Sequence, residues 1–213
     1  GSNLVMPVPG PDCAIGLVKA VQEGRISEKV LDKRVEELLE QVFSLTESVA
    51  AAPKSFDVDA HHAIAEKCAA ASIVLLDNDG ILPLNRNDTV AVIGDFAQNP
   101  RYQGAGSSVV NPTRLDNLIA ELETSGVQIT GYAKGYSRTN PKPDLELTVQ
   151  AMLLAKKSDI AVLCIGLDEI TESEGMDRNS LKLSEGQQKL IDEVRKVNCN
   201  VILVLSGGAP FIM

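Results

Sequence analysis

The densest group of side chains able to transfer a proton lies between Asp168 and Arg178. It holds five acids and one base: Asp168, Glu169, Glu172, Glu174, Asp177 and Arg178. A carboxyl group serves as general acid or base when burial or a neighbouring negative charge raises its pKa. These residues directly follow IAVLCIG (160–166), a run typical of a buried strand. Because parallel α/β sheets usually carry chemistry at strand ends, one of the acids is a candidate catalyst.

Two details favour a role for Glu174. Gly175 follows it and can adopt positive φ, which would let the loop turn sharply and aim the carboxylate. Asp177 and Arg178 can form an ion pair that holds the loop after this turn. A charged loop at a strand end is more often simply solvated, so the residues alone leave both interpretations open.

A second loop, RYQGAGSSVVNP (101–112), follows an earlier strand pattern. Its glycines and serines resemble a phosphate-binding loop, but neither GxxxxGK[ST] nor a GxGxxG running directly into a helix is present. Pro112 intervenes, and we predict the next helix only from about Thr113. A ligand-facing loop and a plain surface loop both remain open, whereas a nucleotide phosphate site is disfavoured.

Metal and cofactor sites are not expected. His61 and His62 have no acid or cysteine at ligand spacing, and we interpret them as capping or packing groups. The four cysteines, far apart in the sequence, are predicted to be reduced thiols, which favours a cytoplasmic compartment: Cys13, Cys68, Cys164 and Cys199.

The negative net charge argues against nucleic acids and anionic membranes as partners. The chain of 213 residues has a net charge of −9 and an isoelectric point near 4.8. Nucleic-acid binding requires a basic surface, and anionic membranes attract basic segments. No apolar run reaches the ~20 residues of a membrane span.

The spacing of apolar residues changes along the chain. Residues 1–12 are predicted to form a loop, and helices are predicted over 13–22 and 27–49 before a linker at 50–58. Helical patterns then alternate with short apolar runs that are typical of strands buried on both faces. The runs are SIVLLD (72–77), TVAVIGDF (89–96), VQITGYA (127–133), IAVLCIG and NVILVLS (200–206), with helices over 59–71, 114–124, 144–157 and 185–197.

This order predicts an α/β fold: a mostly parallel sheet of about five strands with helices on both faces, an α/β sandwich, preceded by a helical segment. Leu82-Pro83-Leu84 should make the first connection a loop. Gly1-Ser2 is typical of a cloning scar, and SGGAPFIM stops directly after a strand. We therefore expect the chain to be truncated at both ends.

Four ordered motifs are similar to a known family. They are HHAIAEKCAAASIVLLDNDGILPL (61–84), RYQGAGSSVVNP, ESEGMDR (172–178) and SGGAP (206–210). Together they resemble the α/β-sandwich domain of glycoside hydrolase family 3, of the β-glucosidase type. NLVMPVPG (3–10) and KAVQEGRISEKVLDKRVEELL (19–39) resemble the end of that family's (β/α)₈ barrel. The implied domains are a barrel tail (1–49), a linker (50–58) and the sandwich (59–213).

The resemblance implies a retaining β-glycosidase that acts on a carbohydrate substrate by double displacement. The barrel would supply the nucleophilic Asp, and the sandwich domain the general acid/base, which matches Glu174, with Glu172 as its rival. Retention requires two carboxyl groups about 5 to 5.5 Å apart. We expect the isolated chain to be inactive without the barrel, and its solvated Glu174 to titrate as an ordinary carboxylate.

Other positions follow from the same resemblance. Arg101, Gln103, Ser107 and Ser108 are expected to shape the loop and contact the barrel, with sugar contact left open. Met176 replaces a common aromatic residue and offers a softer contact to a leaving-group sugar. The truncated sheet could also self-associate. The alternative is a non-catalytic α/β binding or interaction module.

Overall fold

The computed structural model describes residues 2–6 and 10–213. These fall into two compact units, Gly1–Ala71 and Ser72–Met213, and each is described by itself. The predicted domain limits at 49 and 58 remain predictions. Within the described residues, no helix is both long and apolar enough to span a membrane.

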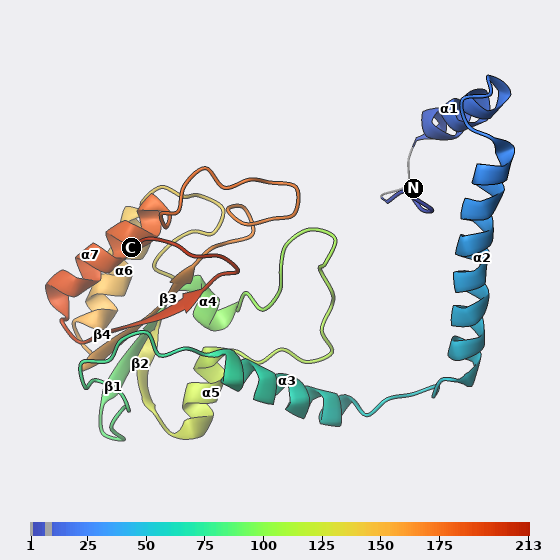
Figure 1. Cartoon of the computed structure of the whole chain (residues 1–213). Coiled ribbons are helices and arrows are strands. Elements are labelled where there is room, and N and C mark those ends of the chain that lie inside the picture. Colours follow the sequence, from blue (N-terminus) through green and yellow to red (C-terminus); the bar gives the residue numbers. More distant parts are fainter. Residues whose placement is uncertain (1, 7–9) are drawn as a thin grey trace. The chain divides into compact units, whose positions relative to one another are not determined.

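The first unit is helical (Figure 1). It contains α1 (Pro11–Gln22), α2 (Glu28–Ala51) and most of α3 (Val58–Ser72), close to the predicted ranges. Pro11 is the first residue of α1, so the loop predicted for residues 1–12 ends earlier than expected. Proline suits this position because its missing N–H would have no helical partner. The predictions that rest on Pro7, Val8 and Pro9 fall outside the described residues.

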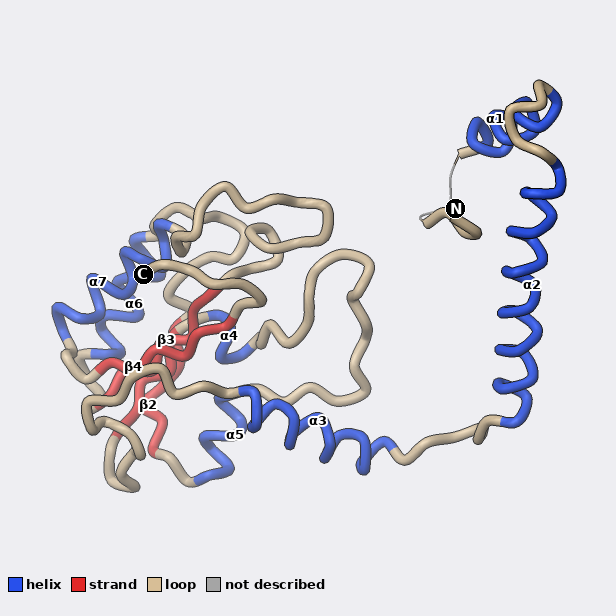
Figure 2. The backbone as a smooth tube through the Cα atoms, viewed as in Figure 1, coloured by secondary structure: helices blue, strands red, loops and turns tan. Residues whose placement is uncertain are grey.

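The second unit contains a parallel sheet, drawn in red in Figure 2. Its strands are β1 (Thr89–Ile93), β2 (Gln128–Ala133), β3 (Ile160–Gly166) and β4 (Val201–Ser206). Their order in the sheet is β2-β1-β3-β4, and every pairing is parallel. The predicted α/β fold is therefore confirmed.

The described residues form a sheet of four strands, where about five were predicted. SIVLLD is not a strand in the described residues, and the side chains of Ile73, Val74, Leu75 and Leu76 are 65–80% exposed. An apolar, β-branched run has strand propensity, but it becomes a strand only where a neighbouring edge offers backbone partners. The predicted loop at Leu82-Pro83 is confirmed, and Asn78 organises it by accepting from the N–H groups of Gly80 and Leu82, both at 3.1 Å.

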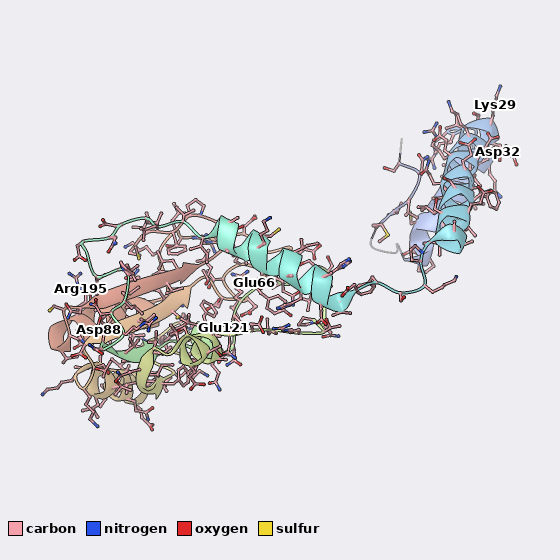
Figure 3. The ribbon with its side chains drawn as sticks, turned by 90° about the horizontal axis from the view of Figure 1, so that it is seen from below. Lys29, Asp32, Glu66, Asp88, Glu121 and Arg195 are labelled. Carbon is pink, nitrogen blue, oxygen red and sulfur yellow. The ribbon has the colours of Figure 1, made fainter. Side chains whose placement is uncertain are left out.

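Helices cover both faces of the sheet, as predicted. Helices α6 (Leu145–Ala155) and α7 (Glu185–Val197) pack on the face that carries Ile93, Leu163 and Ile165. Helices α4 (Asp95–Gln98) and α5 (Leu118–Ser125) pack on the other face. Each large apolar side chain buried in this way contributes about 1.5–3 kcal/mol. Glu121 of α5 and Arg195 of α7, labelled in Figure 3, remain exposed on the outer sides of their helices.

Helix α4 was not predicted, and α5 begins later than the predicted residue 114. Helix α5 begins after Asn117, whose side chain caps it by accepting from the N–H of Ala120 at 3.0 Å. Thr113 therefore lies in the preceding loop. That loop is longer than predicted, which gives the segment after β1 room to reach the neighbouring strand end.

The strand order creates a switch point between β1 and β3. The chain leaves β1 through α4 and α5 on one face, and it leaves β3 through α7 on the other. Because β1 and β3 are neighbours, the connections diverge at their carboxyl ends, where open α/β sheets bind ligands. Both chemistry-bearing segments, 101–112 and 168–178, leave the sheet at this edge.

Candidate active site

Arg101 joins the two loops at the switch point. Its Nη1 lies 2.7 Å from Oε2 of Glu172 and 2.5 Å from the Leu167 carbonyl, and Nη2 donates to the Glu172 carbonyl at 2.9 Å. Only 6% of the Arg101 side chain is exposed. The planar guanidinium thus holds the start of the β3 loop at several points.

Glu172 extends this connection to a third loop. The same Oε2 also accepts from the backbone N–H of Gly208, in the segment after β4, at 3.0 Å. Its carboxylate is therefore occupied by a charged donor and a backbone donor. This placement favours a structural role for Glu172 and weakens it as a rival acid/base.

Glu174 is held differently. Its Oε2 accepts from the backbone N–H of Ser107 at 2.6 Å and from the Ser107 hydroxyl. Its own backbone N–H donates to the Ala105 carbonyl at 3.1 Å. The Glu174 side chain is exposed, as expected, but its contacts shift its pKa. The Ser107 hydroxyl, followed by the Ser107 N–H, lowers the pKa of Glu174, whereas the sequence predicts an ordinary carboxylate.

Glycines on both loops allow this approach. Gly175 has φ of +77°, which confirms the predicted turn beside Glu174. Gly106 has φ of +106°, and a Cβ there would lie 2.5 Å from Cβ of Glu174. Gly106 was not among the predicted site residues. Its signal was the pair of glycines in QGAGSS, but the need for a missing Cβ depends on a partner far away in the sequence.

Arg178 holds the loop, but not through Asp177. Its guanidinium donates to the Pro210 carbonyl at 3.2 Å and to the Ser180 carbonyl at 3.2–3.3 Å. The predicted contact with Asp177 is therefore replaced by backbone carbonyls. Arginine carries five donors in a fixed fork, and two nearby carbonyls fit this fork. The contact ties the β3 loop to the segment after β4.

Two other acids of the loop have structural contacts. Asp168 is buried, and its Oδ1 accepts from the N–H groups of Ile170 at 3.1 Å and Thr171 at 2.7 Å, which forms a turn. Glu169 pairs with Arg138, whose guanidinium lies over the ring of Phe96. Glu174 thus differs from these acids in having its carboxylate exposed and bound by an uncharged partner.

The other predicted residues divide into loop formers and exposed groups. Gln103 closes its own loop: Nε2 donates to the Val110 carbonyl at 3.1 Å, and Oε1 accepts from the Val110 N–H at 2.9 Å. Met176 and Ser108 are exposed beside the site. Sugar contact by any of these residues remains a prediction.

A cleft of about 400 Å³ opens where the loops meet. Its lining comes from the segments after three strands: Arg101, Tyr102, Gln103, Gly104, Ala105, Glu172, Ser173, Glu174, Gly207 and Gly208. Among the described residues, no three His, Cys, Asp or Glu side chains are grouped so that they could hold a metal ion. The lining includes the carboxyl groups of Glu172 and Glu174, which are side chains able to transfer a proton.

The histidines and cysteines are not among the residues that line this cleft. His61 stacks on Phe56 with ring centroids 5.0 Å apart, in agreement with a packing role. All four cysteines are in the described part of the chain and carry thiols that are not in disulfides; Cys164 is buried and the other three are exposed.

Comparison with known proteins agrees with this geometry. Thermostable β-glucosidase B of Acetivibrio thermocellus is 40% identical over 216 residues, which cover 100% of this chain and 28% of that protein. An exo-α-(1→6)-L-arabinopyranosidase of Bifidobacterium breve is 37% identical over 98% of this chain and 28% of that protein. The chain thus spans under a third of the length of these relatives.

A solved structure and a family model add to this. The crystal structure of the family 3 β-glucosidase of Bifidobacterium adolescentis matches with a TM-score of 0.81 and 36% identity, over 99% of this chain and 31% of that one. The model of the glycosyl hydrolase family 3 C-terminal domain matches residues 73–213. The chain therefore belongs to glycoside hydrolase family 3, and its α/β unit is the C-terminal domain of that family.

Proposed function

We propose that this chain supplies the general acid/base loop of a retaining β-glycosidase, with Glu174 as the acid/base. The observation that carries the proposal is the position of Glu174: it lies at the switch-point cleft, exposed, while Glu172 is bound by Arg101 and Gly208. A catalyst must reach a substrate, and the Glu172 carboxylate already accepts hydrogen bonds from Arg101 and Gly208.

In this proposal the reaction runs in two steps. A nucleophilic carboxylate, on a barrel domain outside this chain, attacks the anomeric carbon while Glu174 gives a proton to the leaving oxygen. Glu174 then takes a proton from water, which hydrolyses the glycosyl-enzyme. The substrate class is a terminal β-linked sugar. The relatives carry names for glucosidase and arabinopyranosidase activities, so the sugar is not part of the proposal.

The barrel is proposed as the covalently linked partner. Its support is the length of the relatives, of which this chain covers 28%. Apolar side chains on α1 and α2, including Ile15, Phe43 and Leu45, are more than half exposed and would suit a domain interface. The isolated chain is accordingly proposed to be inactive.

The test is substitution of Glu174 in the complete protein. Glu174→Ala should reduce hydrolysis of β-glycosides with poor leaving groups by about 10²–10⁴-fold. Activated aryl glycosides should be affected less, because their departure needs little protonation. Azide should restore turnover and yield a glycosyl azide. Glu169→Gln, at an acid of the same loop that pairs with Arg138, is the matched control.

Unchanged hydrolysis in the Glu174→Ala enzyme would remove the acid/base assignment. It would then favour the alternative, a non-catalytic binding or interaction module. A chromogenic β-glucoside offered to the 213-residue chain gives a second check, since Glu174-dependent turnover there would contradict the need for a barrel.

Self-association is a further proposal for the chain by itself. It is supported by the exposed run from Ile73 to Leu76 and by β4, which ends the sheet of the described strands and is only partly buried. A second copy could cover such apolar surface. Light scattering should give a larger mass for the parent chain than for the Val74→Lys variant. If both have the mass of a monomer, the chain does not self-associate.

A further inference from the structure

We propose that Ser107 is a positioning residue that gives the two carboxyl oxygens of Glu174 different tasks: Oε2 is anchored to the β1 loop, and Oε1 carries the proton. This inference rests on the proposed function, because it concerns how Glu174 would act as acid and base. Ser107, from the loop after β1, would thus take part in positioning, and Oε1 of Glu174 would be the oxygen that exchanges the proton.

The anchor is built from both loops. The Ser107 N–H and hydroxyl are both directed at Oε2, and the Ala105 carbonyl receives the backbone N–H of Glu174. Gly106, between these two residues, has no Cβ to keep Glu174 at a distance. Among the described residues, the hydrogen bonds found to the Glu174 carboxylate both end on Oε2. One oxygen is therefore fixed and the other is available.

The location of the proton follows from hydrogen-bond chemistry. A backbone N–H can only donate, so a proton on Oε2 would face a donor that cannot accept it. A proton on Oε1 leaves Oε2 as a carbonyl oxygen that still accepts both bonds. The carboxyl group can thus gain and lose its proton at Oε1 without leaving Ser107. Such fixed geometry is what repeated proton transfer to one substrate atom requires.

The anchor also has an electrostatic consequence. Both donors bind the carboxylate more strongly than the neutral acid, in agreement with the lowered pKa of Glu174. Removal of the hydroxyl should raise the pKa and allow the carboxyl group to rotate. A side chain that only filled space would change neither property.

The first experiment uses the 213-residue chain and needs no catalysis. The side-chain carboxyl carbon of Glu174 is titrated by NMR in the parent chain and in three variants. Ser107→Ala should move the midpoint to higher pH, whereas Ser107→Thr, which keeps the hydroxyl, should not. Ser108→Ala removes the neighbouring hydroxyl and should leave the midpoint unchanged.

A midpoint in Ser107→Ala equal to that of the parent chain would overturn the anchor. If Ser107→Ala does not fold, Ser107→Cys provides the comparison, because a thiol is a much weaker donor and should raise the midpoint as well. An unchanged midpoint in Ser107→Cys would count against the proposal in the same way.

The second experiment uses the complete protein. Ser107→Ala should lower kcat about tenfold, the equivalent of one hydrogen bond to a charged group, with little change in KM. The alkaline limb of kcat/KM, which reports loss of the acid's proton, should move to higher pH, and Ser107→Thr should restore both. If the alkaline limb of kcat/KM does not move in Ser107→Ala, Ser107 is not a positioning residue.

The two proposals can fail separately. If Glu174→Ala leaves hydrolysis intact while Ser107→Ala still shifts the titration midpoint, the acid/base assignment fails and the anchor remains a loop contact. If Glu174→Ala abolishes hydrolysis while Ser107→Ala shifts neither the midpoint nor the pH profile, the proposed function stands and the inference about Ser107 is wrong.

Discussion

Arg101 and Glu172 form an ion pair, with 2.7 Å between Nη1 and Oε2, that connects the loop after β1 to the loop after β3. The pair is largely screened from water, with side-chain exposures of 6% and 23%. Two residues further along, Glu174 contacts the same β1 loop through Ser107. The candidate catalyst therefore lies on a segment that is fixed at Glu172 and presented to the cleft at Glu174.

Loss of the Arg101 guanidinium should destabilise this unit. Arg101→Met leaves the Glu172 carboxylate partly buried without its cation, and removal of one partner of a buried pair typically costs about 3 kcal/mol. Arg114→Met is the matched control, because Arg114 is exposed and contacts Asp116 at 3.4 Å, an arrangement worth about 0.5 kcal/mol. Urea unfolding followed by circular dichroism measures both. Equal losses in the two variants would contradict the structural role of the pair.

A methyl group at Gly106 should separate the two loops. Gly106→Ala places a Cβ 2.5 Å from Cβ of Glu174, so the backbone must move and the bonds from Ser107 to Glu174 should break. Gly175→Ala is the control: it also has positive φ, which costs about 1 kcal/mol for alanine, but nothing lies within 4 Å of its Cβ. NMR titration of Glu174 should show a raised midpoint in Gly106→Ala alone. The same midpoint in both variants would exclude steric separation as the cause.

The elements that sequence reasoning placed well are those with strong local signals. IAVLCIG coincides with β3, and α7 occupies the predicted range of 185–197, where Ser184 caps it by accepting from the N–H of Gln187. A continuous apolar run and a capping serine need no distant partner to be recognised. SIVLLD has an equally strong run, yet it is no strand in the described residues, because pairing depends on an available edge.

The candidate site also combines features with a local sequence signal and contacts that depend on distant residues. Glu174 and its turn at Gly175 could be predicted, since the carboxylate and the glycine are adjacent in the sequence. The contacts of Ser107 and Gly106 with Glu174 cross 67 residues or more, and no local pattern reports them. Arg178 shows the opposite error: adjacency to Asp177 suggested a pair, while the fold offered the carbonyl of Pro210 instead.

Gln187 should be required for the end of β3. It is 1% exposed, its Oε1 accepts from the Gly166 N–H at 3.1 Å, and its Nε2 donates to the Gly166 carbonyl at 2.9 Å. Gln187→Met keeps the volume but leaves two buried backbone groups without partners, at about 1–3 kcal/mol each. Gln150→Met, on the exposed side of α6, should cost under about 0.5 kcal/mol. Thermal unfolding that does not distinguish the two variants would show that water or a neighbour replaces Gln187.

Alkaline pH should destabilise the sheet through Cys164. Burial raises the pKa of this thiol from 9.0 to about 12. Below pH 9 the thiol is protonated in both the folded and the unfolded chain, so its contribution to stability is complete. Between about pH 9 and 12 only the unfolded chain ionises, and the free energy of unfolding should fall by about 1.4 kcal/mol per pH unit for this one group.

The measurement is the free energy of unfolding in urea between pH 8 and 10.5. Cys164→Ala should be less stable at every pH because it loses packing, but its stability should decline less steeply above pH 9. Cys199→Ala is the control, because its thiol is exposed and its removal should leave the slope of the parent chain. Burial also raises the pKa of Tyr132 to about 12, so part of the decline above pH 10 should persist in every variant. A slope in Cys164→Ala as steep as that of the parent chain would show that the buried thiol does not set the alkaline limit of this fold.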